Sequence, residues 1–95
     1  MSRKVLKYEL TKSPQTIKLP PDSKVVNVTA MGGKTILWIE GPATPVGGPT
    51  ERTFSVFAPG AEIKNENAVY VGTSAWDKMA FHVYEDLQVP KTVKK

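Results

Sequence analysis

Apolar and polar residues alternate with a period of two along most of this chain, and this pattern limits what it can fold into. In VLKYEL, the side chains of Leu6, Tyr8 and Leu10 fall on one face of an extended strand, whereas Lys7 and Glu9 fall on the other. Because successive side chains of a strand point to opposite faces, this alternation predicts half-buried β-strands. No stretch of ten residues carries the stripe of an amphipathic helix, and the sequence therefore predicts an all-β fold.

Turn residues divide the chain into short strands. Two β-branched runs flank Gly32 and Gly33, a pattern that is typical of a β-hairpin. A Pro/Gly-rich loop is expected at 41–51, because its three prolines and three glycines do not suit a strand ladder. Two further links are expected: the polar segment AEIKNENA at 61–68, with at most one helical turn, and SAWDK at 74–78.

The expected architecture is one small antiparallel domain over residues 1–86, a sandwich or partly open barrel of six to seven strands. Residues 87–95 show no alternation and contain three lysines, which predicts a basic, flexible tail. A 95-residue chain has a thin core. A ligand is therefore expected in a surface groove or in a pocket shared between protomers.

Composition and motifs favour binding over catalysis. The chain has no cysteine, which excludes disulfides and thiol nucleophiles, and its single histidine makes a zinc site improbable. The motif of a serine-hydrolase elbow, the P-loop and the GxGxxG fingerprint are all absent. We therefore expect no enzymatic activity and no cofactor. No signal peptide and no apolar run of membrane-spanning length are visible, so a cytoplasmic location without membrane contact is expected.

Five residues are candidates for contact with a ligand, each with a plain structural alternative. Arg52, beside the long loop, has a guanidinium that suits phosphate, or it is a solvated flanking charge. Thr73, after a glycine, offers a hydroxyl and a backbone N–H, or simply ends a strand. His82 and Tyr84 share the strand face opposite Phe81 and Val83, and they either stack on a ligand or are half-buried. Trp76, within the polar link, either covers one end of the barrel or lies at an interface.

Two further sets of residues are assigned to the core. Trp38, in the middle of ILWIE, is expected to be buried. The last two strands are expected to contribute five apolar side chains to the core: Val69, Val71, Met79, Phe81 and Val83.

The order of several segments resembles a known group of proteins. KYEL, TIKLPPDSKVVNV, ILWIE, RTFSVFAPG, VYVGT and FHVYE follow one another between residues 4 and 85. In that order they look like small domains encoded by phages and prophages, which are catalogued as a domain of unknown function. The resemblance implies a small accessory protein, many of which antagonise host defence. Such a protein is expected to act either as a sponge that sequesters a nucleotide messenger between protomers or as a plug that blocks a host enzyme.

The residues and the resemblance together lead to one functional hypothesis. The net charge of +4 suits attraction to anionic partners, and exposed strand edges favour homo-oligomers. The hypothesis is a non-enzymatic, homo-oligomeric anti-defence protein that binds a small anionic ligand such as a cyclic nucleotide. The alternatives are an inhibitor that binds a host protein and, less expected, an OB-like module that binds nucleic acid.

Overall fold

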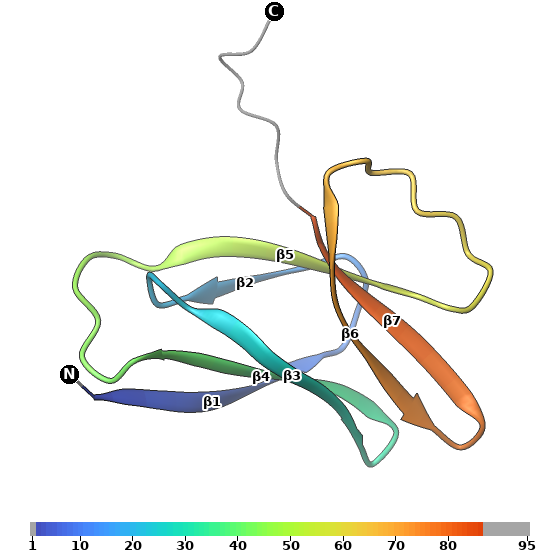
Figure 1. The fold of residues 1–95 in the computed structure, drawn as a ribbon, viewed down its shortest axis with the longest axis horizontal. Coiled ribbons are helices and arrows are strands. Elements are labelled where there is room, and N and C mark those ends of the chain that lie inside the picture. Colours follow the sequence, from blue (N-terminus) through green and yellow to red (C-terminus); the bar gives the residue numbers. More distant parts are fainter. Residues whose placement is uncertain (1, 87–95) are drawn as a thin grey trace, which may run out of the picture.

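The structure, a computed structural model, describes residues 2–86 and confirms the predicted all-β architecture (Figure 1). Its seven strands are β1 (Arg3–Leu10), β2 (Gln15–Leu19), β3 (Lys24–Met31), β4 (Lys34–Pro42), β5 (Thr50–Phe57), β6 (Ala68–Trp76) and β7 (Met79–Asp86). The expected tail at 87–95 lies outside the described residues. Between residues 2 and 86 there is no helix long and apolar enough to cross a membrane.

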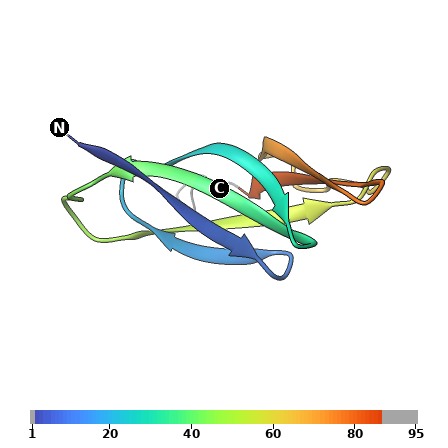
Figure 2. The ribbon, with the colours of Figure 1, turned by 90° about the horizontal axis from the view of Figure 1, so that it is seen from below.

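The strands form two antiparallel sheets. One has the order β1-β4-β3 and the other the order β2-β5-β7-β6. The chain passes between the sheets at the β1–β2, β2–β3 and β4–β5 connections, so that the sheets lie against each other. Figure 2 shows the resulting flat, two-layered molecule from its side. Each sheet therefore turns one face to its partner and the other to solvent.

The core fills the space between the sheets, and strand alternation decides which residues enter it. Fully buried side chains include Leu19, Leu37, Phe54 and Val83, whose strand neighbours point outward. The core cluster consists of Leu10, Ile17, Leu19, Val28, Leu37, Ile39, Phe54 and Val83. Most of these belong to the inward faces that the period-two pattern predicts.

Two short hairpins close the ends of the sheets. The predicted Gly32-Gly33 hairpin is confirmed, and both glycines have positive φ angles of 58° and 79°. The predicted link at 74–78 is wrong in its extent, because β6 continues to Trp76 and the turn consists of Asp77 and Lys78 alone. These two residues have φ angles of 48° and 67°, and such paired positive values are typical of a type I′ turn.

Replacing Lys78 in the Asp77-Lys78 turn with glycine should stabilise the fold. A lysine in the left-handed region costs about 1 kcal/mol more than a glycine does. Lys78→Gly is therefore expected to raise the melting temperature by about 4 °C. The matched control is Lys64→Gly, which removes the same charge from the β5–β6 loop, where Lys64 has no positive φ. Thermal unfolding of both variants tests this, and an equal response would contradict the turn geometry.

Two loop boundaries differ from the predictions. The loop expected at 41–51 is shorter, because β4 extends through Pro42 and β5 begins at Thr50. Pro42 is compatible with the ladder because it occupies the last position of its strand, paired with Arg3. The segment 61–68 contains no helical turn, and its last residue already belongs to β6.

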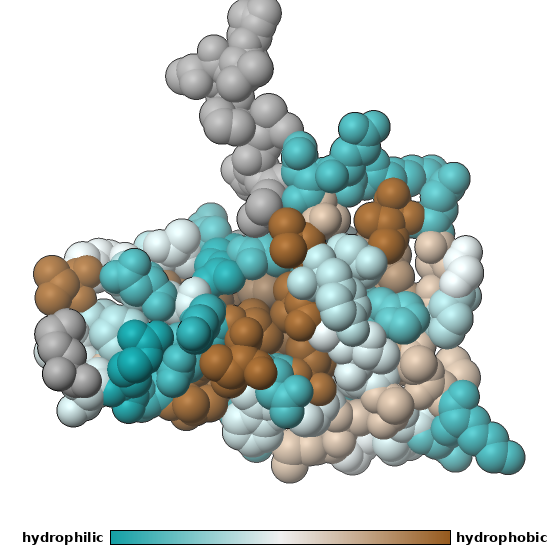
Figure 3. All heavy atoms as spheres, viewed as in Figure 1, coloured by the Kyte–Doolittle hydropathy of each residue, from teal (hydrophilic) through white to brown (hydrophobic). Residues whose placement is uncertain are grey.

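The edge strands β3 and β6 lie against each other, and each contains a β-bulge. The pairing register shifts between Val25 and Asn27 on β3 and between Tyr70 and Gly72 on β6. The β3 bulge turns Val26 outward, where about half of it is exposed. Hydrophobic side chains gather over the seam between these strands (Figure 3). Irregular edges of this kind hinder pairing with further strands.

The predicted core of β6 and β7 is correct only in part. Val83 is buried as expected, and Phe81 and Val71 are partly buried. Val69 and Met79, however, are exposed, because they lie near the ends of the β6–β7 pair, beyond the main core cluster.

Candidate ligand-binding face

The structure brings three of the five predicted site residues together on one side of the four-stranded sheet. Thr73 on β6 is paired directly with His82 on β7, and Tyr84 is paired with Tyr70. Val83 alternates with His82 and Tyr84 and is fully buried, so these side chains point away from the core. Phe57 on β5 pairs with His82 on the other side of β7. We call this set, Phe57, Tyr70, Thr73, His82 and Tyr84, the tyrosine face.

Hydrogen bonds and ring contacts hold the tyrosine face in place. The Thr73 Oγ1 lies 2.9 Å from the His82 Nδ1 and 2.6 Å from the Tyr70 hydroxyl. The Tyr84 ring packs edge-to-face on both neighbouring aromatic rings, with centroids 5.5 Å from Tyr70 and 5.8 Å from Phe57. Such packing fixes the side chains before a ligand arrives, which lowers the entropic cost of binding.

The chemistry of this face suits recognition. Tyrosine rings can stack on a planar heterocycle, and the hydroxyls and the imidazole can donate or accept hydrogen bonds. His82 uses its Nδ1 for Thr73, which leaves Nε2 for a ligand. In a hydrolytic triad a carboxylate would orient this imidazole, and here a threonine hydroxyl has that place. Among the described residues, no three histidines, cysteines or acids are grouped to hold a metal ion.

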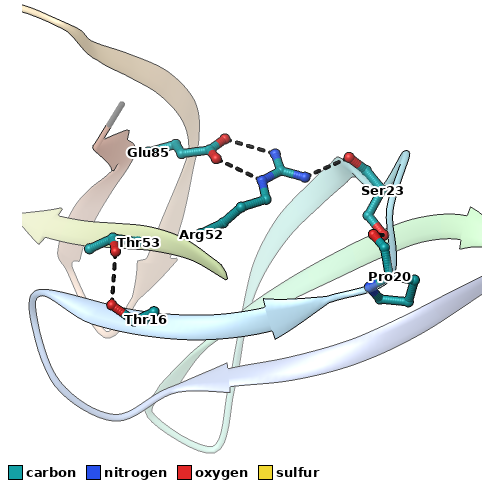
Figure 4. A network of polar contacts seen from close by, with 6 residues as sticks. All are labelled: Thr16, Pro20, Ser23, Arg52, Thr53 and Glu85. Carbon is teal, nitrogen blue, oxygen red and sulfur yellow. Dashed lines mark hydrogen bonds and ion pairs between the residues drawn. The ribbon is translucent and has the colours of Figure 1, made fainter. Parts of the chain in front are cut away.

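Arg52 is not on the tyrosine face. Its Nε and Nη2 donate to the two carboxylate oxygens of Glu85 at 2.7 Å and 2.8 Å, and its Nη1 donates to the backbone oxygen of Ser23 at 2.6 Å (Figure 4). The side chains of Arg52 and Glu85 are only 21% and 14% exposed. The hydrogen bonds to Glu85 raise the pKa of Arg52, against an opposing effect of burial, and the negative charge of Glu85 adds to the rise. Arg52 therefore joins β5, β7 and the β2–β3 turn.

Trp76 lies at the tip of the β6–β7 hairpin. A Cβ atom at Gly33 would lie 3.2 Å from its Cζ2 atom, so the indole packs against the β3–β4 turn. The side chain is nevertheless about half exposed. Trp76 thus covers one end of the fold, as the first of its two expected roles requires, and a role at an interface stays a prediction.

Sequence reasoning missed Tyr70 and Phe57. Period two places Phe57 opposite Phe54 and Val56, so its outward direction was readable from the sequence. Tyr70 was hidden, because strict alternation puts residues 70 and 73 on opposite faces. The bulge at Val71 adds one residue to β6 and brings Tyr70 to the same face as Thr73.

A groove of about 500 Å³ opens between the sheets near the β1–β2 connection and the Gly32-Gly33 turn. Lys12 and Lys34 line it together with Phe81, and none of the five predicted site residues does so. The tyrosine face, by contrast, brings together the predicted residues Thr73, His82 and Tyr84. The tyrosine face is therefore the stronger candidate.

Comparison with known proteins places the chain in a family. The model of one family, described as Domain of unknown function (DUF7352), matches residues 1–92. No curated protein and no solved structure matches the chain. Because the match spans nearly the whole sequence, the chain belongs to the DUF7352 family of domains of unknown function.

Proposed function

We propose that this protein is a non-enzymatic binding protein whose tyrosine face recognises a small anionic ligand with a planar ring, such as a cyclic nucleotide. The observation that carries the proposal is the fixed arrangement of Tyr70, Tyr84 and His82 on a side of the sheet that faces solvent. About half of the Tyr70 side chain is exposed. Aromatic side chains that remain accessible on a sheet surface are typical of binding surfaces.

The phosphate and the ring of such a ligand have different partners on this face. The ring stacks on the tyrosines, with an expected contribution of about 1–3 kcal/mol per base. The phosphate meets the Tyr70 hydroxyl and the Nε2 of His82, which lie at the two ends of the hydrogen-bond chain through Thr73. Arg52, expected from the sequence to hold the phosphate, is instead bound to Glu85 and to the backbone oxygen of Ser23, away from the tyrosine face. The net charge of +4 attracts the anion over longer distances.

The biological role in this proposal rests on the resemblance to phage- and prophage-encoded domains. A small binding protein from a phage, acting in the host cytoplasm, would sequester a nucleotide messenger of host defence. Homo-oligomers would allow the tyrosine face to form a pocket shared with a second protomer. The alternative is that the same aromatic face contacts a host protein, because tyrosines are enriched at protein interfaces.

Substitutions on the tyrosine face should weaken ligand binding without unfolding the protein. In calorimetric titrations with a panel of cyclic di- and trinucleotides, Tyr84→Ala and Tyr70→Ala are each expected to weaken binding at least tenfold, about 1.4 kcal/mol. Tyr84→Phe keeps the ring and should retain most of the affinity. The matched control is Met79→Ala, on the same hairpin and about as exposed as Tyr70, which should bind as the unmodified protein does.

Three outcomes would contradict parts of the proposal. If no cyclic nucleotide in the panel binds, the ligand class is wrong. If a host protein then co-purifies and Tyr84→Ala releases it, the inhibitor alternative replaces the sponge. A strictly monomeric protein by light scattering, with the nucleotide bound, would remove the shared pocket and leave a single-protomer site.

A further inference from the structure

The solvent side of the other sheet, β1-β4-β3, collects positive charge around a tryptophan. Leu37 and Ile39 on β4 are fully buried in the core, and Trp38 between them therefore points to the opposite side. The sequence predicted a buried Trp38, but the structure places it on this outer surface, partly exposed. Strand pairing adds the cations to the same side. We call this set, Arg3, Lys7, Lys24, Lys34 and Trp38, the basic face.

Trp38 lies at the centre of the basic face with polar neighbours on both sides. Its direct partners in the register are Lys7 on β1 and Asn27 on β3. Its Nε1 donates a hydrogen bond of 2.8 Å to the Thr29 hydroxyl on β3. The bond fixes the indole across the neighbouring strand, where its outer surface meets solvent.

The basic face accounts for the positive charge of the described part of the chain. Residues 2–86 contain ten of the thirteen lysines and arginines and all nine acids, a net charge of +1. The four cations of the basic face share their side of the sheet with two carboxylates, Glu9 and Glu40, so that this side has a net charge of +2. The remaining described residues therefore carry a net charge of −1.

The ion pairs on this face leave part of its charge unneutralised. Glu40 is shared by Arg3 at 3.3 Å and Lys24 at 3.9 Å, and Glu9 meets Lys34 at 3.0 Å. Within residues 2–86, Lys7 has no carboxylate within ion-pair distance. A lysine without a carboxylate partner beside an ordered indole is a combination that suits a phosphate next to a base.

We infer that the basic face binds single-stranded nucleic acid, with a base stacked on Trp38 and backbone phosphates on Lys7, Lys24 and the neighbouring cations. A flat sheet with one central aromatic residue can reach only unpaired bases, because the bases of a duplex are already stacked on one another. This site lies on the other sheet from the tyrosine face and is independent of the proposed small-ligand site.

Tryptophan fluorescence tests this inference. In a Trp76→Phe background, Trp38 is the only indole, and a thymidine oligonucleotide about ten nucleotides long should quench it. Lys7→Glu should weaken binding about five- to tenfold and reduce the slope of log K against log salt by about 0.7. The matched control is Lys64→Glu, which makes the same change of charge in the β5–β6 loop.

Three results would overturn the inference. If the oligonucleotide does not quench Trp38 fluorescence, there is no site on the basic face. The same conclusion follows if Lys7→Glu and Lys64→Glu weaken binding equally. Tyr84→Ala should leave oligonucleotide binding unchanged. Loss of oligonucleotide binding in Tyr84→Ala, with Lys7→Glu unaffected, would move the nucleic acid to the tyrosine face and refute the inference.

Discussion

Arg52→Ala is expected to destabilise the fold by about 3 kcal/mol and to lower the melting temperature by roughly 15 °C. The substitution leaves the carboxylate of Glu85, whose side chain is only 14% exposed, without its bidentate partner. It also leaves the backbone oxygen of Ser23 without its donor. Uncompensated charges and acceptors in partly buried places are among the most costly changes in a small domain.

Two comparisons isolate this ion pair. Arg3→Ala breaks an ion pair whose arginine side chain is 47% exposed, and such surface pairs contribute at most about 1 kcal/mol. Arg52→Met combined with Glu85→Leu removes both charges and should cost less than Arg52→Ala alone. A cost for Arg52→Ala no larger than that for Arg3→Ala would show that the Arg52–Glu85 pair does not stabilise the fold in the way proposed.

The pH dependence of this contribution has a definite sign. Hydrogen bonds from Arg52 to Glu85 raise the pKa of the guanidinium above its ordinary value. A group whose folded pKa is raised stabilises the fold fully below its unfolded pKa, and that stability is lost only as the pH rises through the folded value. Arg52 stays fully charged between about pH 6 and pH 9. The difference in unfolding free energy between Arg52→Ala and the unmodified protein should therefore not change across this range through any loss of the Arg52 charge.

Gly72→Ala is expected to destabilise the protein by about 2–3 kcal/mol, although it adds a single methyl group. A Cβ at this position would lie 2.6 Å from the Cγ2 and 2.9 Å from the Cβ of Val28. Gly72 has no positive φ, so the cost comes from the close approach of β6 to β3 and not from backbone strain. Chemical denaturation of the purified variant measures it.

Shortening Val28 should compensate for the added methyl group. Val28→Ala alone leaves a small cavity, but in the double variant the methyl group introduced by Gly72→Ala fills part of that space. We expect the double variant to be more stable than the sum of the single changes by at least about 1 kcal/mol. Gly48→Ala serves as the control, because no atom lies within 4 Å of its added Cβ. Full additivity would contradict the contact between the two edge strands.

Strand alternation was sufficient for most of the fold because it depends only on local sequence. It predicted the Gly32-Gly33 hairpin and the inward positions of Ile17, Leu19 and Phe54. Alternation gave wrong predictions at the β-bulges, where a strand contains an extra residue, and at the ends of strands. The bulges at Val26 and Val71 shift the pattern by one position, and period two contains no signal for such an insertion.

The candidate sites depended on tertiary contacts that no local pattern contains. The sequence correctly grouped His82 with Tyr84, since both lie on one strand. It could not reveal that Arg52 would meet Glu85, which is 33 positions away. It also assigned Trp38 to the core, because a tryptophan between isoleucine and leucine reads as buried until the sheet face that it occupies is known.

A nuclear magnetic resonance titration tests the central claim, that the tyrosine face binds the ligand, most directly. The probe is the cyclic nucleotide from the panel that raises the melting temperature most, added to ¹⁵N-labelled protein. The account predicts that the amide shifts of Tyr70, Thr73, His82 and Tyr84 change together, with smaller changes at the residues around Trp38. Shifts confined to the basic face or the groove, or no shift with any cyclic nucleotide, would contradict it.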